Sequence, residues 1–142
     1  MEEKKLNVGR LMTRDVVTLD VNMSILDAIE KMTKYSIGSL IITEVGDPVG
    51  ILTERDIIKC FHNNNVPPNS IPVRKAMNFP LITISQNDEV SDAVRRMNSN
   101  SVRRLVVVED RKLIGIITER DILRTLPHVY LQLAEYEKKS QK

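Results

Sequence analysis

A threonine and an aspartate recur three positions apart at two places in the chain, as Thr53-x-x-Asp56 and Thr118-x-x-Asp121. In both places an apolar run typical of a strand ends at the threonine, and an apolar helical pattern begins after it. The two side chains can cap the helix by accepting hydrogen bonds from its unpaired first amides. Such a junction can also bind an anion, because those amides and the positive end of the helix dipole face outward. A hydroxyl and a carboxylate beside them match a ribose phosphate, so capping and binding are both open, and they do not exclude each other.

The two motifs lie within a duplication that covers most of the chain. Residues 8–60 align without a gap on residues 73–125, at an offset of 65 positions and with seventeen identities. One copy is too short to bury a large core alone, so we expect the two copies to form one compact module with pseudo-twofold symmetry. The expected organisation is a first repeat (6–62), a linker (63–72), a second repeat (73–126) and a C-terminal helical tail (127–142).

Each repeat predicts the order β-α-β-β-α, which gives an α+β fold class. In the first repeat we expect strands at 16–19, 40–44 and 49–52, with helices that begin at Asn22 and Thr53. In the second repeat we expect strands at 81–84, 105–109 and 114–117, with helices that begin at Asn87 and Thr118. Both asparagines are of a type that caps helices, since their side chains accept hydrogen bonds from first-turn amides. This arrangement puts both Thr-x-x-Asp motifs where the last strand of a repeat meets its closing helix.

Composition and charge exclude several classes of protein. The chain has 142 residues, a net charge of +2 and one cysteine, Cys60. A single cysteine cannot form a disulfide within the chain, and no apolar signal or membrane-spanning run is visible, so we expect a cytoplasmic protein. No nucleophile with a base, no phosphate-binding glycine loop and no metal-ligand cluster stands out. We therefore predict neither an enzyme nor a metal site.

Three features occur in both repeats: the segment Gly-apolar-apolar-Thr-Glu-Arg-Asp-Ile, the opening segments Val8–Met12 and Val73–Met77, and the Asp-Ala pairs at 27–28 and 92–93. With these features the chain resembles a cystathionine-β-synthase (CBS) domain pair, also called a Bateman module. The resemblance covers roughly residues 6–126. It implies a non-catalytic module that binds an adenosine-containing ligand (AMP, ADP, ATP or S-adenosylmethionine) in clefts between the repeats. Such modules usually regulate an attached or associated effector, and no effector domain is visible in this sequence. Adenine and ribose are common to these ligands, so the resemblance does not select among them.

The resemblance also implies roles for individual residues. Asp56 and Asp121 are expected to accept hydrogen bonds from ribose hydroxyls, and Thr53 and Thr118 to contact a phosphate. The adenine is expected near the first strand of a repeat and the start of its second strand; the candidates are Thr18, Thr83, Ile37 and Val102. The phosphates are expected near basic residues; the candidates are Arg103, Arg104, Arg55 and Arg120.

The two repeats differ at one pair of positions close to these candidates. Arg103-Arg104 of the second repeat corresponds to Gly38-Ser39 of the first. If these arginines line a cleft, that cleft should bind phosphate more tightly, because a charge-assisted hydrogen bond contributes about 1.5–3 kcal/mol. The alternative is that both arginines are solvated surface residues.

Two other functions compete with ligand binding. A nucleic-acid-binding protein would use Arg95-Arg96, Arg103-Arg104 and the lysine-rich tail, although aromatic residues for base stacking are few. A structural dimerisation module would leave its clefts empty. For a ligand-binding module and for a structural module alike, we expect a homodimer that forms through exposed helices. The closing helices supply more apolar surface than a small core needs, with Ile57-Ile58-Phe61 in one and Ile122-Leu123-Leu126 in the other. Tyr130, Leu133 and Tyr136 of the tail could extend this surface.

Overall fold

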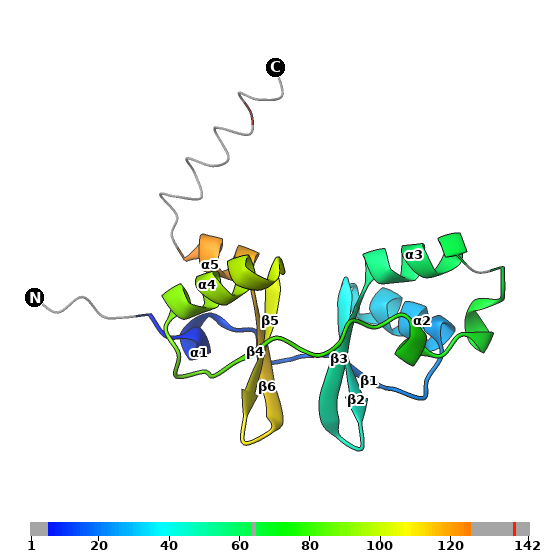
Figure 1. The fold of residues 1–142 in the computed structure, drawn as a ribbon, viewed down its shortest axis with the longest axis horizontal. Helices are drawn as coiled ribbons and strands as arrows, with labels where there is room; N and C mark the ends of the chain where they lie inside the picture. The colour runs from blue at the N-terminus through cyan, green and yellow to red at the C-terminus, as the bar shows by residue number, and fades with distance from the viewer. Residues whose placement is uncertain (1–5, 64, 126–137, 139–142) are drawn as a thin grey trace, which may run out of the picture. The chain divides into compact units, whose positions relative to one another are not determined.

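The computed structural model of the protein describes residues 6–63, 65–125 and 138 (Figure 1). These residues form two compact units. The Asp56 unit comprises residues 15–81 and 110–113, and the Asp121 unit comprises residues 6–14, 82–109 and 114–125. The predicted helical tail, with Leu126 and Tyr130 to Tyr136, lies outside the described residues.

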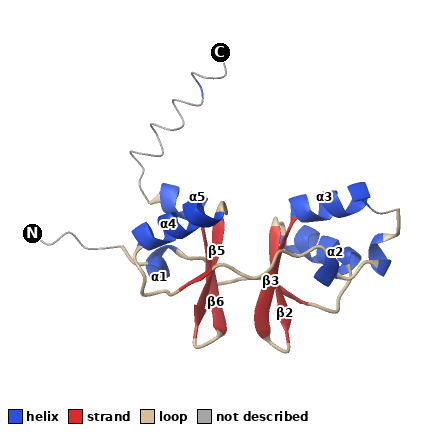
Figure 2. Cartoon of the chain, in the orientation of Figure 1, coloured by secondary structure: helices blue, strands red, loops and turns tan. Residues whose placement is uncertain are grey.

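The Asp56 unit is a three-stranded sheet with two helices on one side (Figure 2). Its strands are β1 (Thr18–Asp20), β2 (Ser39–Glu44) and β3 (Asp47–Thr53), in that order across the sheet, and its helices are α2 (Ile25–Tyr35) and α3 (Glu54–Asn63). Strand β1 pairs with β2 in parallel, and β2 pairs with β3 antiparallel through a tight hairpin at Val45 and Gly46. Two short 3-10 turns follow, η1 (Pro68–Ser70) and η2 (Val73–Lys75).

The Asp121 unit has the same plan. Its strands are β4 (Thr83–Ile84), β5 (Arg104–Glu109) and β6 (Lys112–Thr118), and its helices are α1 (Val8–Leu11), α4 (Val90–Asn100) and α5 (Glu119–Arg124). The parallel pairs Thr18–Ile41 and Thr83–Val106 show that the two sheets share one register at the offset of 65. The predicted β-α-β-β-α order and the mixed α+β class are therefore confirmed for both repeats.

Helices α2 and α4 each begin two residues later than we expected. Ser24, and not Asn22, caps α2: its hydroxyl accepts from the Asp27 amide at 3.2 Å, and its own amide donates to the Asp27 carboxylate at 2.9 Å. The Ser24 hydroxyl also donates to Asp27 Oδ2 at 2.9 Å. The bonds that the carboxylate accepts, first from the Ser24 backbone and then from the Ser24 side chain, lower the pKa of Asp27. Glu89, and not Asn87, precedes α4 and donates its amide to Asp92 at 3.2 Å. The two asparagines were wrong as caps because the chain is still in a turn there, with the Asn22 amide bonded to Asp20.

Each repeat contributes its opening segment to the unit that contains the rest of the other repeat. The backbone of Thr13 exchanges two hydrogen bonds with Ile116, at 2.9 and 3.0 Å, within the Asp121 unit. The backbone of Asn78 exchanges the equivalent bonds with Ile51, at 3.1 and 2.8 Å, within the Asp56 unit. Asn78 therefore lies on the same unit as Asp56, although it belongs to the second repeat in sequence.

Each unit has its own apolar core between sheet and helices. In the Asp56 unit the core is built around fully buried Ile25, Leu40, Ile42 and Leu52, and in the Asp121 unit around Val8, Leu105, Val107 and Ile117. In the part of the chain that the structure describes, no helix has the length and apolar content needed to cross a membrane. The cores hold each last strand and closing helix in place, and so fix the two Thr-x-x-Asp junctions.

Candidate ligand site at the strand-to-helix junctions

The first junction places Thr53 at the end of β3 and Asp56 in the first turn of α3. The Thr53 amide and the Thr53 hydroxyl each donate to Asp56 Oδ2 at 2.8 Å, and the Asp56 amide donates to Thr53 Oγ1 at 3.3 Å. A third donor, the Asn78 side-chain amide, reaches the same Oδ2 at 2.7 Å. The pair therefore does cap the helix, and one carboxylate oxygen is used for all three contacts.

The second junction repeats the capping geometry with fewer contacts. Thr118 ends β6, and its amide donates to Asp121 Oδ2 at 2.9 Å, while the Asp121 amide donates to Thr118 Oγ1 at 3.1 Å. Neither the Thr118 hydroxyl nor another side chain of the described residues donates to Asp121. Asp121 Oδ2 thus accepts one hydrogen bond where Asp56 Oδ2 accepts three.

Capping leaves both motifs able to bind a ligand. Among the described residues, Oδ1 of Asp56 and Oδ1 of Asp121 have no hydrogen-bond partner. Both aspartates and both threonines are half-buried, so the two junctions are partly shielded from water. An ionised carboxylate with a free oxygen accepts hydrogen bonds from a pair of hydroxyls well. The two roles weighed from the sequence are therefore compatible in this geometry.

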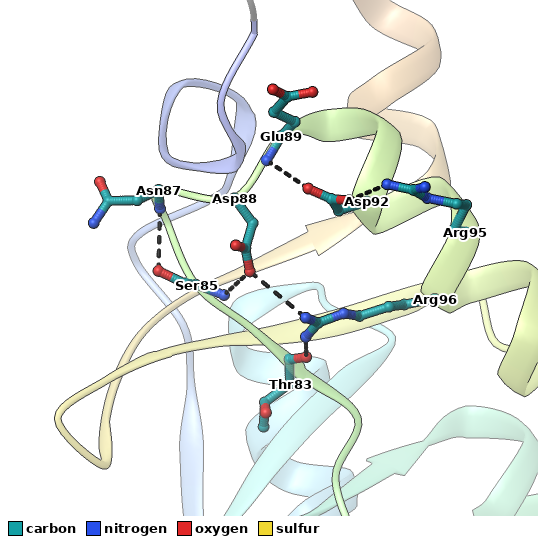
Figure 3. A network of polar contacts seen from close by, with 8 residues as sticks. All are labelled: Thr83, Ser85, Asn87, Asp88, Glu89, Asp92, Arg95 and Arg96. Atoms are coloured by element: carbon teal, nitrogen blue, oxygen red, sulfur yellow. Dashed lines mark hydrogen bonds and ion pairs between the residues drawn. The ribbon is translucent and has the colours of Figure 1, made fainter.

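The adenine candidates Thr18 and Thr83 open the edge strands β1 and β4. A cation from the neighbouring helix holds the backbone carbonyl of each: Lys31 Nζ lies 2.6 Å from Thr18 O, and Arg96 Nη1 lies 2.5 Å from Thr83 O. Figure 3 shows the wider network, in which Arg96 also reaches Asp88 at 3.8 Å. These contacts tie down the backbone of strands that have a neighbour on one side only.

The candidates Ile37 and Val102 lie where the second strand of each repeat is about to begin. Ile37 lines a hollow of about 400 Å³ with Ile57 and Ile58, and Val102 lines one of about 490 Å³ with Ile122 and Leu123. Neither Thr53 and Asp56 nor Thr118 and Asp121 are among the residues lining these hollows. Within a single unit, the structure brings each threonine together with its aspartate. Ile37 and Val102 directly precede Gly38 and Arg103, whose carbonyls accept hydrogen bonds from the first amides of α3 and α5, at 3.1 and 2.9 Å.

The four candidate arginines have different surroundings. Arg103 Nε lies 4.0 Å from Glu119 Oε2, with the two side chains 87% and 59% exposed, so this ion pair contributes little. Arg104 is half-buried at the start of β5, whereas Arg55 and Arg120 are exposed beside the two aspartates. Among the described residues, Arg55, Arg104 and Arg120 have no ion-pair partner. These three guanidinium groups are available to an anion, and Arg103 is shared with Glu119.

Three residues that contact the candidates were not predicted in this role: Asn78, Lys31 and Arg96, of which Arg96 was considered only for nucleic-acid binding. Asn78 lies 22 positions from Asp56, and no local pattern pairs them. Lys31 and Arg96 are equivalent in the duplication, and both are cations on the first helix of a repeat. A positive charge kept at equivalent positions of both repeats is a pattern from which a shared contact could have been predicted. Within residues 6–63 and 65–125, no three metal-ligating side chains come together.

A model of the CBS domain family matches the chain twice, over residues 8–63 and 73–128. An uncharacterized protein of Methanopyrus kandleri is 36% identical over 140 residues, which cover 97% of this chain and 71% of that protein. Two solved structures have similar folds, each with a TM-score of 0.77. One is the CBS domain pair of protein MJ0100 in complex with 5'-methylthioadenosine and S-adenosyl-L-methionine, at 27% identity, covering 87% of this chain and 98% of that chain. The other is a hexameric CBS-CP12 protein from bloom-forming cyanobacteria, at 28% identity, covering 85% of this chain and 68% of that chain.

Proposed function

Because the chain belongs to the CBS domain family, we propose that it is a regulatory module that binds an adenosine-containing ligand and signals its occupancy to a partner protein. In this proposal Asp56 and Asp121 accept hydrogen bonds from the ribose hydroxyls of AMP, ADP, ATP or S-adenosylmethionine. Thr53 and Thr118 contact a phosphate or the group in its place. Ligand and partner would be coupled because the partner has different affinities for the occupied and empty states.

The observation that carries this proposal is the repeated half-buried carboxylate with one free oxygen. At both junctions Oδ2 caps a helix while Oδ1 has no partner among the described residues. Capping occupies one oxygen of each carboxylate, so the other can still accept hydrogen bonds from the two vicinal hydroxyls of a ribose. The adenosyl ligands in the related domain pair of MJ0100 support the choice of ligand class.

A thermal-shift assay with AMP, ATP and S-adenosylmethionine tests the proposal. A ligand present at 100 times its dissociation constant stabilises the folded protein by about 2.7 kcal/mol, which raises the melting temperature measurably. We expect a shift with at least one of the three and a much smaller shift with UMP, which carries ribose and phosphate but a different base. The double variant Asp56→Ala/Asp121→Ala should lose the shift, and Asp47→Ala, which removes an exposed carboxylate at the start of β3, should keep it.

No shift with any adenosyl ligand would instead favour a structural module with empty clefts. Of the candidates for the nucleic-acid alternative, Arg95 pairs with Asp92, and Arg96 contacts both Thr83 and Asp88 (Figure 3). Filter binding at two salt concentrations checks this alternative, since nucleic-acid binding would be tight and would weaken steeply with salt.

We further propose that the chain forms a homodimer through its exposed helical surface. Ile57 and Ile122 are 7% exposed and belong to the cores, but Ile58 is 68% exposed and Phe61 is 39% exposed on α3. An apolar side chain as exposed as Ile58 is typical of an interaction surface when it has apolar neighbours. The hexameric CBS-CP12 protein supports assembly as a property of related chains.

We expect Ile58→Asp to convert the dimer into a monomer at micromolar concentration, measured by light scattering. Val45→Asp is the matched control, because Val45 is 93% exposed in the β2–β3 turn and away from the helices. A wild-type protein that already has the mass of a monomer contradicts this proposal.

A further inference from the structure

The two aspartates of the candidate site are not equally available to a ligand. Asp56 Oδ2 accepts hydrogen bonds from the Thr53 amide, the Thr53 hydroxyl and the Asn78 side-chain amide, at 2.8, 2.8 and 2.7 Å. Asp121 Oδ2 accepts from the Thr118 amide at 2.9 Å, and the described residues provide no further donor. The junctions therefore differ by two donors, the Thr53 hydroxyl and the Asn78 side-chain amide, and of these two only the amide comes from outside the Thr-x-x-Asp motif.

The additional amide comes from one position in the duplication. Asn78 and Thr13 are equivalent at the offset of 65, and their backbones form the same pair of hydrogen bonds, Asn78 with Ile51 and Thr13 with Ile116. Both residues are exposed. The backbone therefore presents the two side chains from equivalent places. The asparagine carries an amide long enough to reach the carboxylate, and the shorter threonine makes no such contact.

We propose that Asn78 is an internal competitor that weakens ligand binding at Asp56, so that the two sites fill in order, Asp121 first. This inference rests on the proposed function. A carboxylate has about four lone-pair sites to offer, and a ribose hydroxyl that donates to Asp56 meets one that already accepts from three donors. The ligand must share the carboxylate with Asn78 or displace its amide, and it loses part of a charge-assisted hydrogen bond in doing so.

The test measures the Asp56 site alone, in an Asp121→Ala background, by calorimetric titration with AMP and with S-adenosylmethionine. Asn78→Thr installs the residue that the other repeat carries, and we expect it to tighten binding at Asp56 by about 5–10-fold, a fraction of the value of a hydrogen bond to a charged group. Asn78→Ala removes the same amide and must agree in direction. Conversely, in an Asp56→Ala background, Thr13→Asn should weaken binding at Asp121 by a similar factor.

The outcomes separate this inference from the proposed function. If ligand binds but Asn78→Thr and Asn78→Ala leave the affinity at Asp56 unchanged, the competitor role is wrong and the binding module stands. If neither ligand binds the unsubstituted protein, both proposals fail. Melting temperatures of all variants, compared with that of their parent background, verify that a changed affinity does not come from unfolding.

Discussion

Replacing Gly115 with alanine is expected to lower the free energy of unfolding by about 2–3 kcal/mol, in the range found for overpacked sites. A methyl group at this position would lie 2.8 Å from the Thr13 carbonyl oxygen and 2.8 Å from Met12 Sδ. The methionine side chain can move aside, but the carbonyl is bonded to Ile116 at 3.0 Å and cannot move without breaking that pair. The substitution therefore separates the opening segment of the chain from β6.

Gly50→Ala is the matched comparison, because Gly50 is the equivalent residue of the other repeat. Its added methyl group would lie 2.6 Å from Met77 Sδ but 3.1 Å from the Asn78 carbonyl oxygen, so most of the conflict is with a flexible side chain. We expect a loss of about 1 kcal/mol, at the low end of the same range. Urea unfolding of the three proteins measures the difference. Equal midpoints for Gly115→Ala and the unsubstituted protein would contradict a close packing of residues 12–13 on β6.

Asp121→Ala is expected to weaken adenylate binding by about 10–100-fold, the equivalent of 1.5–3 kcal/mol for hydrogen bonds to a charged group. Asp56→Ala should weaken it less, because Asp56 already shares its Oδ2 among three donors. Arg104, half-buried with no ion-pair partner among the described residues, belongs to the Asp121 unit and has Ser39 as its counterpart in the first repeat. Both differences favour the Asp121 site.

Calorimetric titration of the two variants with AMP or ATP measures this asymmetry. Each substitution also removes a helix-capping contact, which costs about 1 kcal/mol of stability. The titrations therefore need melting curves beside them, and Asp47→Ala serves as a variant that loses an exposed carboxylate without a cap. Equal losses of affinity for Asp56→Ala and Asp121→Ala would remove the argument that the sites differ.

The sequence was sufficient to predict the architecture of each repeat because that architecture depends on local patterns. Short apolar runs and helical apolar spacing predicted β-α-β-β-α in both repeats, and the structure gives the two sheets the same register, with Thr18–Ile41 equivalent to Thr83–Val106. The Thr-x-x-Asp caps were also predictable, since each capping contact joins residues three positions apart. Local capping patterns failed at Asn22 and Asn87, where the turn continues for two further residues before the helix begins.

The exchange of opening segments could not be predicted from such patterns. Val8 and Val73 are identical and equivalent, so nothing in their local sequence says which repeat each one packs against. The structure places Val8 in the core with Leu105 and Val73 in the core with Leu40. The contact between Asn78 and Asp56 follows from that exchange and was invisible for the same reason.

The most direct test of the proposed site is a crystal structure of the protein soaked with AMP or S-adenosylmethionine. We predict ribose hydroxyls within hydrogen-bond distance, about 2.5–3.0 Å, of the free Oδ1 of Asp121, with Asp56 occupied only at higher ligand concentration. A ligand bound away from both carboxylates, or junctions filled by the protein's own side chains at saturating ligand, would contradict the proposed adenosyl site.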